Sequence, residues 1–189
     1  TNVIVDEKGN PSGIVIANRS GRQAIRCKAI IDASHIAIVA RMAGASFTDF
    51  KPDKYSFSFV TVGSKPQTLP DTKIEKVPYV ITVNNKELPV TRYTFRMHVE
   101  EDSYETIQKI EQNIRDKTWT PDQSDSSDLL EYLPFVRIIP DQTFTNDIAS
   151  VREIPMEALQ PKGIKNIWVL GPSAGISKGT ALKISRPVY

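Results

Sequence analysis

The sequence of 189 residues lacks several features that would define a class of protein. Its single cysteine, Cys27, excludes an internal disulfide and a cysteine-rich metal site, and its apolar surroundings favour a buried, inert thiol over a nucleophile. Neither glycine-rich phosphate-binding motif occurs, whether G-x-G-x-x-G or G-x-x-x-x-G-K followed by Ser or Thr. No apolar run approaches the roughly 20 residues that span a bilayer. We therefore expect no membrane partner and no phosphate cradle within this chain.

A strong charge of either sign is also missing. The 24 Lys and Arg nearly balance the 22 Asp and Glu, the formal net charge is +2, and the signs are interspersed. Without a basic stripe, we expect no nucleic-acid partner. The only two histidines, His35 and His98, are the candidates for acid–base chemistry near neutral pH, and an exposed residue without such a role is the alternative for each. Asp122, Asp125 and Asp128 lack the spacing of a calcium loop, so we expect no metal site.

Two apolar segments near opposite ends of the chain carry the strongest pattern. Residues 24–34 and 166–175 each have the composition of a buried strand that ends in a turn of small residues. The backbone of such a turn can approach a ligand closely, as at the strand ends of nucleotide-binding sheets. The N-terminal elements are predicted as strands over 2–6, 13–18 and 22–32 and a helix over 35–43, which Ser34 caps and Gly44 ends.

The centre of the chain has a different pattern. Alternation over residues 55–62 predicts a half-buried strand, and Asp102 with Glu105 forms the capping box of a predicted helix. The other central and C-terminal predictions are a hairpin of 78–84 with 90–99, helices over 103–117 and 127–132, and strands over 135–139, 151–154 and 166–170. The buried stripe of the first of these helices is predicted as Tyr104, Ile107, Ile110 and Ile114.

These elements predict an α+β fold. We expect α/β-type end segments around a central, mostly antiparallel sheet with one or two helices. The end segments, residues 1–50 and 160–189, would form one domain, and residues 51–159 would be inserted between them as a second. The oligomeric state and the localisation do not follow from the sequence.

The end segments resemble a known family. Residues 13–34, 167–174 and 180–188 are similar to FAD-dependent oxidoreductases with a glutathione-reductase-like FAD fold. In that family a three-stranded β-meander leads into a strand that ends in the sequence I-D-A-T-G. Residues 32–34 of this chain are Asp, Ala and Ser, so the Thr and Gly of the family pattern are absent.

The resemblance implies a flavoprotein, with a partial FAD-type domain in residues 1–50 and 160–189 and an inserted, substrate-type domain in residues 51–159. FAD is expected in the full-length protein and is not expected to bind tightly to this fragment, because the dinucleotide fingerprint would lie outside the chain. The chain begins and ends inside predicted elements, which indicates an internal fragment that is inactive by itself. The implied cofactor contacts are Asp32, Ala33, Ser34, Gly171, Pro172, Ser173 and Ala174.

Functions from different classes stay open at this point. In the first, the chain is part of an FAD-dependent oxidoreductase whose small-molecule substrate has a carboxylate that Arg96 and His98 contact. In the second, it is a carbohydrate-active or carbohydrate-binding domain, because some relatives of this type carry a xanthan-lyase label and aromatic residues alternate on the central strands. Those aromatic residues are Tyr55, Phe57, Phe59, Tyr79, Tyr93 and Phe95. We find no lyase constellation, no catalytic residue is identified, and a structural module without a ligand is the third possibility.

Overall fold

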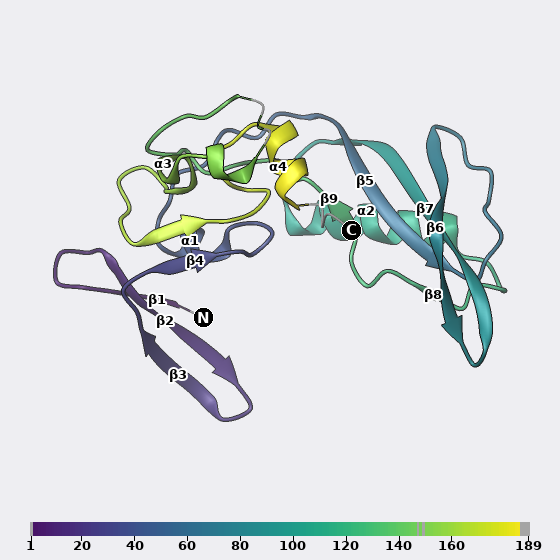
Figure 1. Cartoon of the computed structure of the whole chain (residues 1–189), viewed down its shortest axis with the longest axis horizontal. Helices are drawn as coiled ribbons and strands as arrows, with labels where there is room; N and C mark the ends of the chain where they lie inside the picture. Colours follow the sequence, from purple (N-terminus) through teal and green to yellow (C-terminus); the bar gives the residue numbers. More distant parts are fainter. Residues whose placement is uncertain (1, 147, 149, 186–189) are drawn as a thin grey trace. The chain divides into compact units, whose positions relative to one another are not determined.

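The computed structural model describes residues 2–146, 148 and 150–185, and its contacts divide the chain into two compact units. The first unit consists of Thr1–Asp49 and Pro134–Tyr189, and the second of Phe50–Leu133 (Figure 1). The end of the predicted similarity over 180–188 falls on residues outside the described ones. The roles predicted for the two parts of the chain stay predictions.

The first unit begins with an antiparallel sheet of order β1-β2-β3. Its strands are β1 (Asn2–Val5), β2 (Pro11–Asn18) and β3 (Gly21–Arg26). The prediction of one strand over 22–32 is wrong, because the chain changes its partner after β3. The Cys27 amide still donates to Ser12 O at 3.0 Å, whereas the Ile30 amide donates to Asn166 O at 2.8 Å. Cys27 therefore lies half-buried in a connection and not inside an apolar strand.

A second sheet in this unit joins strands from opposite ends of the chain. Its members are β4 (Ile30–Asp32) and β10 (Ile167–Val169). They run parallel, in a register from Ile167 opposite Ile30 to Val169 opposite Asp32, and Figure 1 shows the yellow arrow of β10 beside β4. These four residues are buried and form one face of the sheet. The predicted strand over 166–170 is confirmed in position. It pairs with β4, which is the end of the segment predicted as one strand over 22–32.

The helices of the first unit are short: one follows β4, two precede β10 and one follows β10. They are α1 (Ile38–Met42), the 3-10 helix η1 (Val151–Glu153), α3 (Met156–Leu159) and α4 (Lys178–Ser185). The helix predicted over 35–43 begins only at Ile38, and Gly44 follows it with a φ of 82° that favours glycine. The strand predicted over 151–154 is wrong, because Ser150 and Glu153 form a capping box that holds a helical turn. Residues 135–139 contain no strand, only an isolated bridge from Ile138 to Phe47.

The second unit is built on an antiparallel sheet of order β6-β7-β5-β8, with β9 also paired to β5. Its strands are β5 (Asp53–Val62), β6 (Thr72–Val83), β7 (Lys86–Val99), β8 (Asp125–Ser126) and β9 (Glu131–Tyr132). The predicted hairpin is confirmed in position, but both of its strands are longer than the predicted 78–84 and 90–99. Asn84 and Asn85, with φ of 50° and 61°, form a two-residue turn between β6 and β7. The helix predicted over 127–132 is wrong, since the chain there pairs with β5. The fold class is α+β, as predicted.

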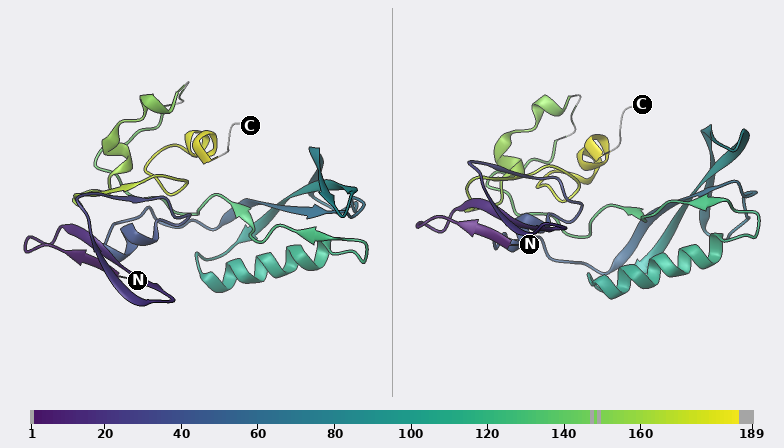
Figure 2. Two further views of the ribbon diagram at one scale, coloured as in Figure 1. Left: turned by 60° about the horizontal axis from the view of Figure 1, so that its bottom comes forward. Right: turned by 90° about the horizontal axis from the view of Figure 1, so that it is seen from below.

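One long helix, α2 (Tyr104–Thr118), covers one face of this sheet (Figure 2). The Arg115 guanidinium lies 5.0 Å from the centre of the Phe59 ring, which places the helix on the face that carries the aromatic core. The buried side chains of that core include Phe57, Phe59, Tyr93, Phe95, Ile110 and Ile114. Tyr104, predicted in the buried stripe, is instead 80% exposed.

The cap of α2 is Ser103 and not the predicted Asp102. The Ser103 hydroxyl accepts from the Thr106 amide at 3.2 Å, and the helix begins one residue later than the predicted capping box requires. We expect Ser103→Ala to lower the free energy of unfolding of the second unit by about 1 kcal/mol, because one amide of the first turn loses its acceptor. Urea unfolding measured through Trp119 fluorescence in a Trp168→Phe background checks this, with Asp102→Ala as the matched control. A larger loss of unfolding free energy for Asp102→Ala than for Ser103→Ala would instead identify Asp102 as the cap.

Candidate functional site

The two predicted cofactor segments meet at one edge of the β4–β10 sheet. Since the strands are parallel, their carboxyl ends lie side by side, and each end passes into a turn of small residues. The Leu170 amide donates to Asp32 O at 2.9 Å, and the Ser173 hydroxyl donates to His35 O at 2.9 Å. The structure therefore brings residues 32–35 and 170–174 into direct contact.

The carboxylate of Asp32 organises the first of these turns. It is 2% exposed, and one of its oxygens accepts from the amides of Val39 and Ala40 at 2.8 and 2.9 Å, at the start of α1. The other oxygen accepts from the Ser34 amide at 3.1 Å and from the Ser34 hydroxyl at 2.5 Å. Four donors from its own turn thus occupy the carboxylate, so Asp32 positions the turn and has little capacity left for a ligand.

The Ser34 hydroxyl and a strained alanine complete this turn. The Ser34 hydroxyl also accepts from the Ile38 amide at 2.8 Å, so this side chain too is engaged within the turn. Ala37 has a φ of 51°, in the region that favours glycine, and is fully buried. The family pattern has its glycine at the position of His35, whereas the left-handed residue of this turn is Ala37, two positions later. His35 is exposed in the same turn.

The second turn presents a backbone surface at Gly171. A β-carbon added there would meet only Ser34 O, at 4.0 Å, which is an ordinary van der Waals contact. Gly171 and Pro172 are half-buried, whereas Ser173 and Ala174 are fully buried. This edge therefore fits only part of FAD. It offers backbone at Ala33, Gly171 and Pro172 for close approach, but its hydroxyls and its carboxylate already make hydrogen bonds within the turns. It suits a ring or a ribose better than a phosphate.

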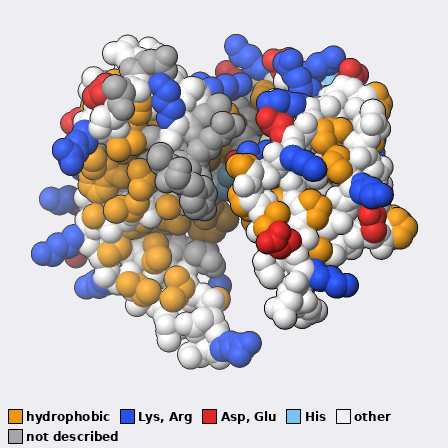
Figure 3. Space-filling model, turned by 45° about the vertical axis from the view of Figure 1, so that its right-hand side comes forward, with side chains coloured by type: hydrophobic (Ala, Val, Ile, Leu, Met, Phe, Trp, Pro, Cys, Tyr) orange, Lys and Arg blue, Asp and Glu red, His pale blue; other side chains and the backbone are white. Residues whose placement is uncertain are grey.

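The opposite face of the β4–β10 sheet is open. Ile31 and Leu170 are 67% and 50% exposed, and the Trp168 indole N–H is buried without a hydrogen-bond acceptor among the described residues. Figure 3 shows hydrophobic side chains over a broad area of the first unit, on the left of the view. Parallel sheets are normally covered on both faces, so a two-stranded parallel sheet with an exposed apolar face is unusual.

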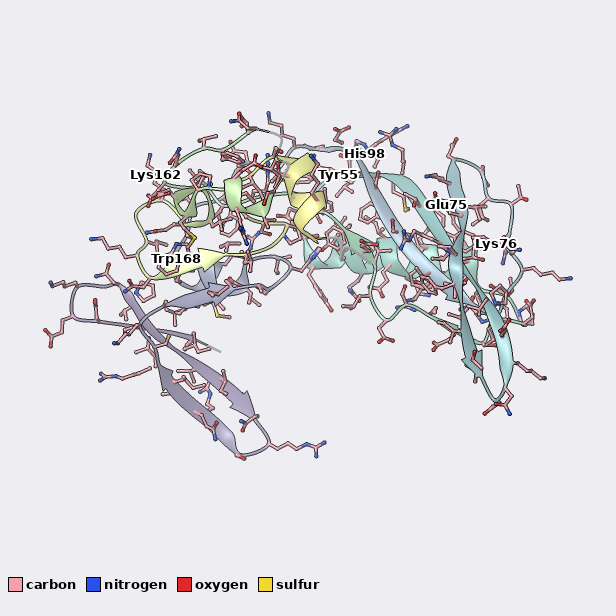
Figure 4. All side chains as sticks on the ribbon, viewed as in Figure 1. Tyr55, Glu75, Lys76, His98, Lys162 and Trp168 are labelled. Carbon is pink, nitrogen blue, oxygen red and sulfur yellow. The ribbon has the colours of Figure 1, made fainter. Side chains whose placement is uncertain are left out.

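In the second unit, the predicted substrate residues lie on the sheet face opposite α2. Arg96 stands opposite Ser56, and His98 opposite Lys54, on the neighbouring strands β7 and β5. His98 Nε2 lies 3.0 Å from Glu100 Oε1, and both side chains are exposed, so this pair contributes little to stability. Figure 4 shows His98 and Glu75 on the strands of this sheet. Arg96 is exposed and makes no ion pair with any described residue.

The sequence analysis missed a third basic residue on this face, Arg92. It is half-buried between Val60 of β5 and Glu75 of β6, and its Nε has no hydrogen-bond partner within the part of the chain that the structure describes. Arg92 lies two positions before Thr94 and four before Arg96, so strand alternation places all three side chains on one face. The sequence alone therefore contained the signal that Arg92 belongs to this face. Together these side chains form a face that suits an anion.

A tyrosine on the other side of β5 is not available for proton transfer at neutral pH. Burial raises the pKa of the Tyr55 phenol above its usual value, and the nearby carboxylates of Asp53 and Asp102 raise it further. Its hydroxyl donates to Lys51 O at 2.7 Å. Tyr55 therefore stays protonated and tethers the start of the strand.

The aromatic residues of the central strands do not form a sugar-binding surface. Phe57, Phe59, Tyr93 and Phe95 are buried in the core under α2, where they cannot stack on a saccharide. Tyr79 is 55% exposed near the hairpin end of β6. The feature that suggested a carbohydrate-active domain is thus mainly the core of the second unit.

Other types of site have little support among the described residues. They contain no group of three or more His, Cys, Asp and Glu side chains able to hold a metal ion, and no helix long and apolar enough to cross a membrane. The first unit also has an open cavity of about 690 Å³ that Cys27 lines. Its other lining residues are Val5, Asp6, Glu7, Lys8, Ser12, Arg26 and Lys28.

Comparison with known proteins gives two similar solved structures. The chain is similar to BexE, studied for oxidation during BE-7585A biosynthesis, with a TM-score of 0.46 and 10% identity. It is similar to CabE, an aromatic hydroxylase from angucycline biosynthesis, with a TM-score of 0.43 and 12% identity. Each alignment covers 92% of this chain and 32% of the other, so the chain spans about a third of their length. These values are too low to assign a shared activity. No protein-family model and no curated protein matches the chain.

Proposed function

We propose that this chain is an internal part of an FAD-dependent oxidoreductase. The observation that carries the proposal is the parallel pairing of β4 with β10, which places the two segments that resemble the flavoprotein family at one sheet edge. The first unit would supply part of the flavin-domain sheet, and the second unit the substrate domain. FAD, when bound, would supply hydride or electron transfer, and the polypeptide would position it.

The residues proposed to hold the cofactor act mainly through the backbone. Ala33, Gly171 and Pro172 would lie against the flavin nucleotide, because no side chain blocks the approach at Gly171. Asp32, Ser34, Ser173 and Ala174 would support these positions from behind, since their polar groups already bind within the two turns or are buried. The phosphate-binding residues would come from another part of the longer protein.

The open face of the β4–β10 sheet supports the same proposal. A strand pair with Ile31 exposed on one face and buried side chains on the other has the pattern of a fragment of a larger sheet. In the proposed protein, further strands and a helix of the flavin domain would cover Ile31 and Leu170.

The substrate would be a small anionic molecule. Arg96, Arg92 and His98 lie on one face of the β5–β7 sheet, and a guanidinium without an ion-pair partner among the described residues can bind a carboxylate through two hydrogen bonds. Ser56, opposite Arg96, could supply a further hydroxyl contact. The identity of the substrate and of the electron acceptor stays outside the proposal.

The proposal is tested with Gly171→Ala in the longest natural protein that contains this chain. We expect that protein to be purified with a flavin absorption band, and the variant to bind FAD about tenfold more weakly or worse, because a methyl group would occupy the approach surface. The stability of the FAD-free protein is the control and should not fall, since the added β-carbon meets only Ser34 O at 4.0 Å. A parent protein without flavin, even after reconstitution with FAD, would reject the proposed function.

A further inference from the structure

The second half of β6 is an exposed apolar edge of the sheet in the second unit. In the order β6-β7-β5-β8, β6 is the outermost strand and pairs with β7 alone among the described strands. All residues from Tyr79 to Val83 are exposed, so neither face of the strand is covered there. The large hydrophobic side chains among them are Tyr79, Val80, Ile81 and Val83, with exposed fractions of 55%, 51%, 39% and 45%. Figure 2 shows this end of the β6–β7 hairpin extending away from α2.

The two halves of β6 differ in how they are protected against a further strand. The first half carries Lys73, Glu75 and Lys76, and its register with β7 shifts around Pro78. Charges, prolines and register shifts are the devices that keep the edges of sheets from pairing with other chains. Residues 79–83 contain no charge and no proline, and all of them are aromatic or β-branched residues, which favour strands. The unprotected part of the edge therefore begins after the shift.

The two-residue turn fixes which backbone groups face this free edge. Val83 and Lys86 flank the turn and are a hydrogen-bonded pair, and such pairs alternate along an antiparallel ladder. Ile81 therefore also bonds to β7, whereas the N–H and C=O groups of Val80 and Thr82 point outward. A further strand could pair with these outward groups without disturbing the hairpin.

We propose that this edge pairs with the same edge of a second copy of the chain, as antiparallel strands related by a two-fold axis at Ile81. In this register Val80 of each copy lies opposite Thr82 of the other, so the outward backbone groups of both strands meet. Each such pair exchanges both of its hydrogen bonds, and the two-fold axis produces the pair twice. The assembly closes as a dimer, because both copies use the same edge.

The side chains match in the same register. Ile81 lies opposite Ile81 of the other copy as a non-hydrogen-bonded pair, in which side chains approach more closely. Tyr79 lies opposite Val83 of the other copy, and pairs of an aromatic with a β-branched residue stabilise sheets. Residues 77–83 contain no charged side chain, so the paired segments place no like charges opposite each other. This neutral, apolar edge is therefore complementary to a second copy of itself.

The contact is small, because it involves one strand of each copy. Stable specific interfaces begin at about 1,200 Å² of buried surface, and a single pair of short strands buries less. We therefore expect a weak, reversible dimer with a Kd of roughly 100 µM. The dimer does not depend on the proposed flavin function, since no residue proposed to bind FAD or substrate takes part in it.

The first test is sedimentation equilibrium of the intact chain at increasing concentration, which should show a monomer–dimer equilibrium. Ile81→Lys should weaken the dimer about tenfold or more, because it places two like charges opposite each other at the two-fold axis. Its thermal midpoint should stay near that of the parent chain, since Ile81 is an exposed side chain. Ile31→Lys adds the same charge to the exposed apolar face of the first unit and is the matched control, which should dimerise as the parent does.

The second test fixes the register by cross-linking in a Cys27→Ala background. Two cysteines from Ile81→Cys face each other across a non-hydrogen-bonded pair, where the Cα atoms are about 4.5 Å apart and within reach of a disulfide. Two cysteines from Val83→Cys lie four positions apart along the paired strands, roughly 13 Å, which is too far. Air oxidation should therefore link the Ile81→Cys chains and leave the Val83→Cys chains mostly single.

Several results would overturn the proposal. They are a chain that stays monomeric up to about ten times the expected Kd, a dimer that Ile81→Lys does not weaken, a dimer that Ile31→Lys abolishes, and equally fast cross-linking through both cysteines. Loss of the dimer with Ile31→Lys would assign the contact to the open face of the first unit instead.

Discussion

Replacing Asp32 with alanine should lower the free energy of unfolding of the first unit by about 3 kcal/mol. The carboxylate is 2% exposed and accepts from three amides and one hydroxyl of its own turn. Alanine leaves the amides of Val39 and Ala40, at the start of α1, without an acceptor, and the Ala40 amide is buried. The turn between β4 and α1 should therefore lose its fixed shape.

The measurement is urea unfolding followed by Trp168 fluorescence in a Trp119→Phe background. Trp168 lies in the first unit and Trp119 in the second, so this background reports on the affected unit alone. Asp49→Ala, at an exposed aspartate of the same unit, is the matched control and should shift the midpoint only slightly. Asp32→Asn should fall between the two, because one of its two acceptor oxygens remains. Equal midpoints for Asp32→Ala and Asp49→Ala would show that the carboxylate does not hold the turn.

Gly175→Ala should lower the free energy of unfolding of the first unit by about 2 kcal/mol. A β-carbon at this position would lie 2.5 Å from Pro140 Cγ and 2.6 Å from Pro140 Cβ, and a proline ring cannot turn away as a flexible side chain can. The neighbouring contacts offer no room either, because the Gly175 amide donates to Ala158 O at 3.2 Å and Arg137 donates to Ile176 O.

The matched control for Gly175→Ala is Gly171→Ala in the same turn. Both replacements remove the same conformational freedom, but only the β-carbon at Gly175 meets a neighbour closer than 3 Å. Thermal unfolding of the two variants should therefore separate them, with a lower midpoint for Gly175→Ala alone. Similar midpoints would mean that the segment around Pro140 moves to accept the extra methyl group.

The sequence predicted the two turns of the candidate site, but not how their residues are held. The apolar runs ending in small residues predicted the turns at residues 32–34 and 171–174, because a buried strand and the turn after it leave a local pattern. The role of Asp32 could not be predicted, because the amides that it binds depend on where α1 begins. The sequence predicts a start at residue 35, whereas the helix begins at Ile38. The contrast between Gly171 and Gly175 depends on Pro140, a neighbour only in space.

The error at residues 127–132 has a long-range cause. Residues 127–132 have the local composition of a short helix, yet β9 there pairs with Ser58 and Phe57 of β5. Short strands of two residues are stabilised by a partner far away in the sequence and not by their own pattern. The cap of α2 was misplaced by one residue for a local reason, because Asp102 and Ser103 are both good capping residues.

By itself, the sequence determined the α+β class, the long alternating strands, the Asn84–Asn85 hairpin and the helix between residues 104 and 118, because each depends on periodicity or on the conformational preferences of a few neighbouring residues. Only the tertiary structure decided that the chain leaves one sheet at Cys27 and joins another at Ile30, and that β4 pairs with β10, which comes more than a hundred residues later in the sequence. Those features depend on hydrogen bonds and packing between residues distant in sequence, and a local pattern carries no information about which distant segment will supply the partner.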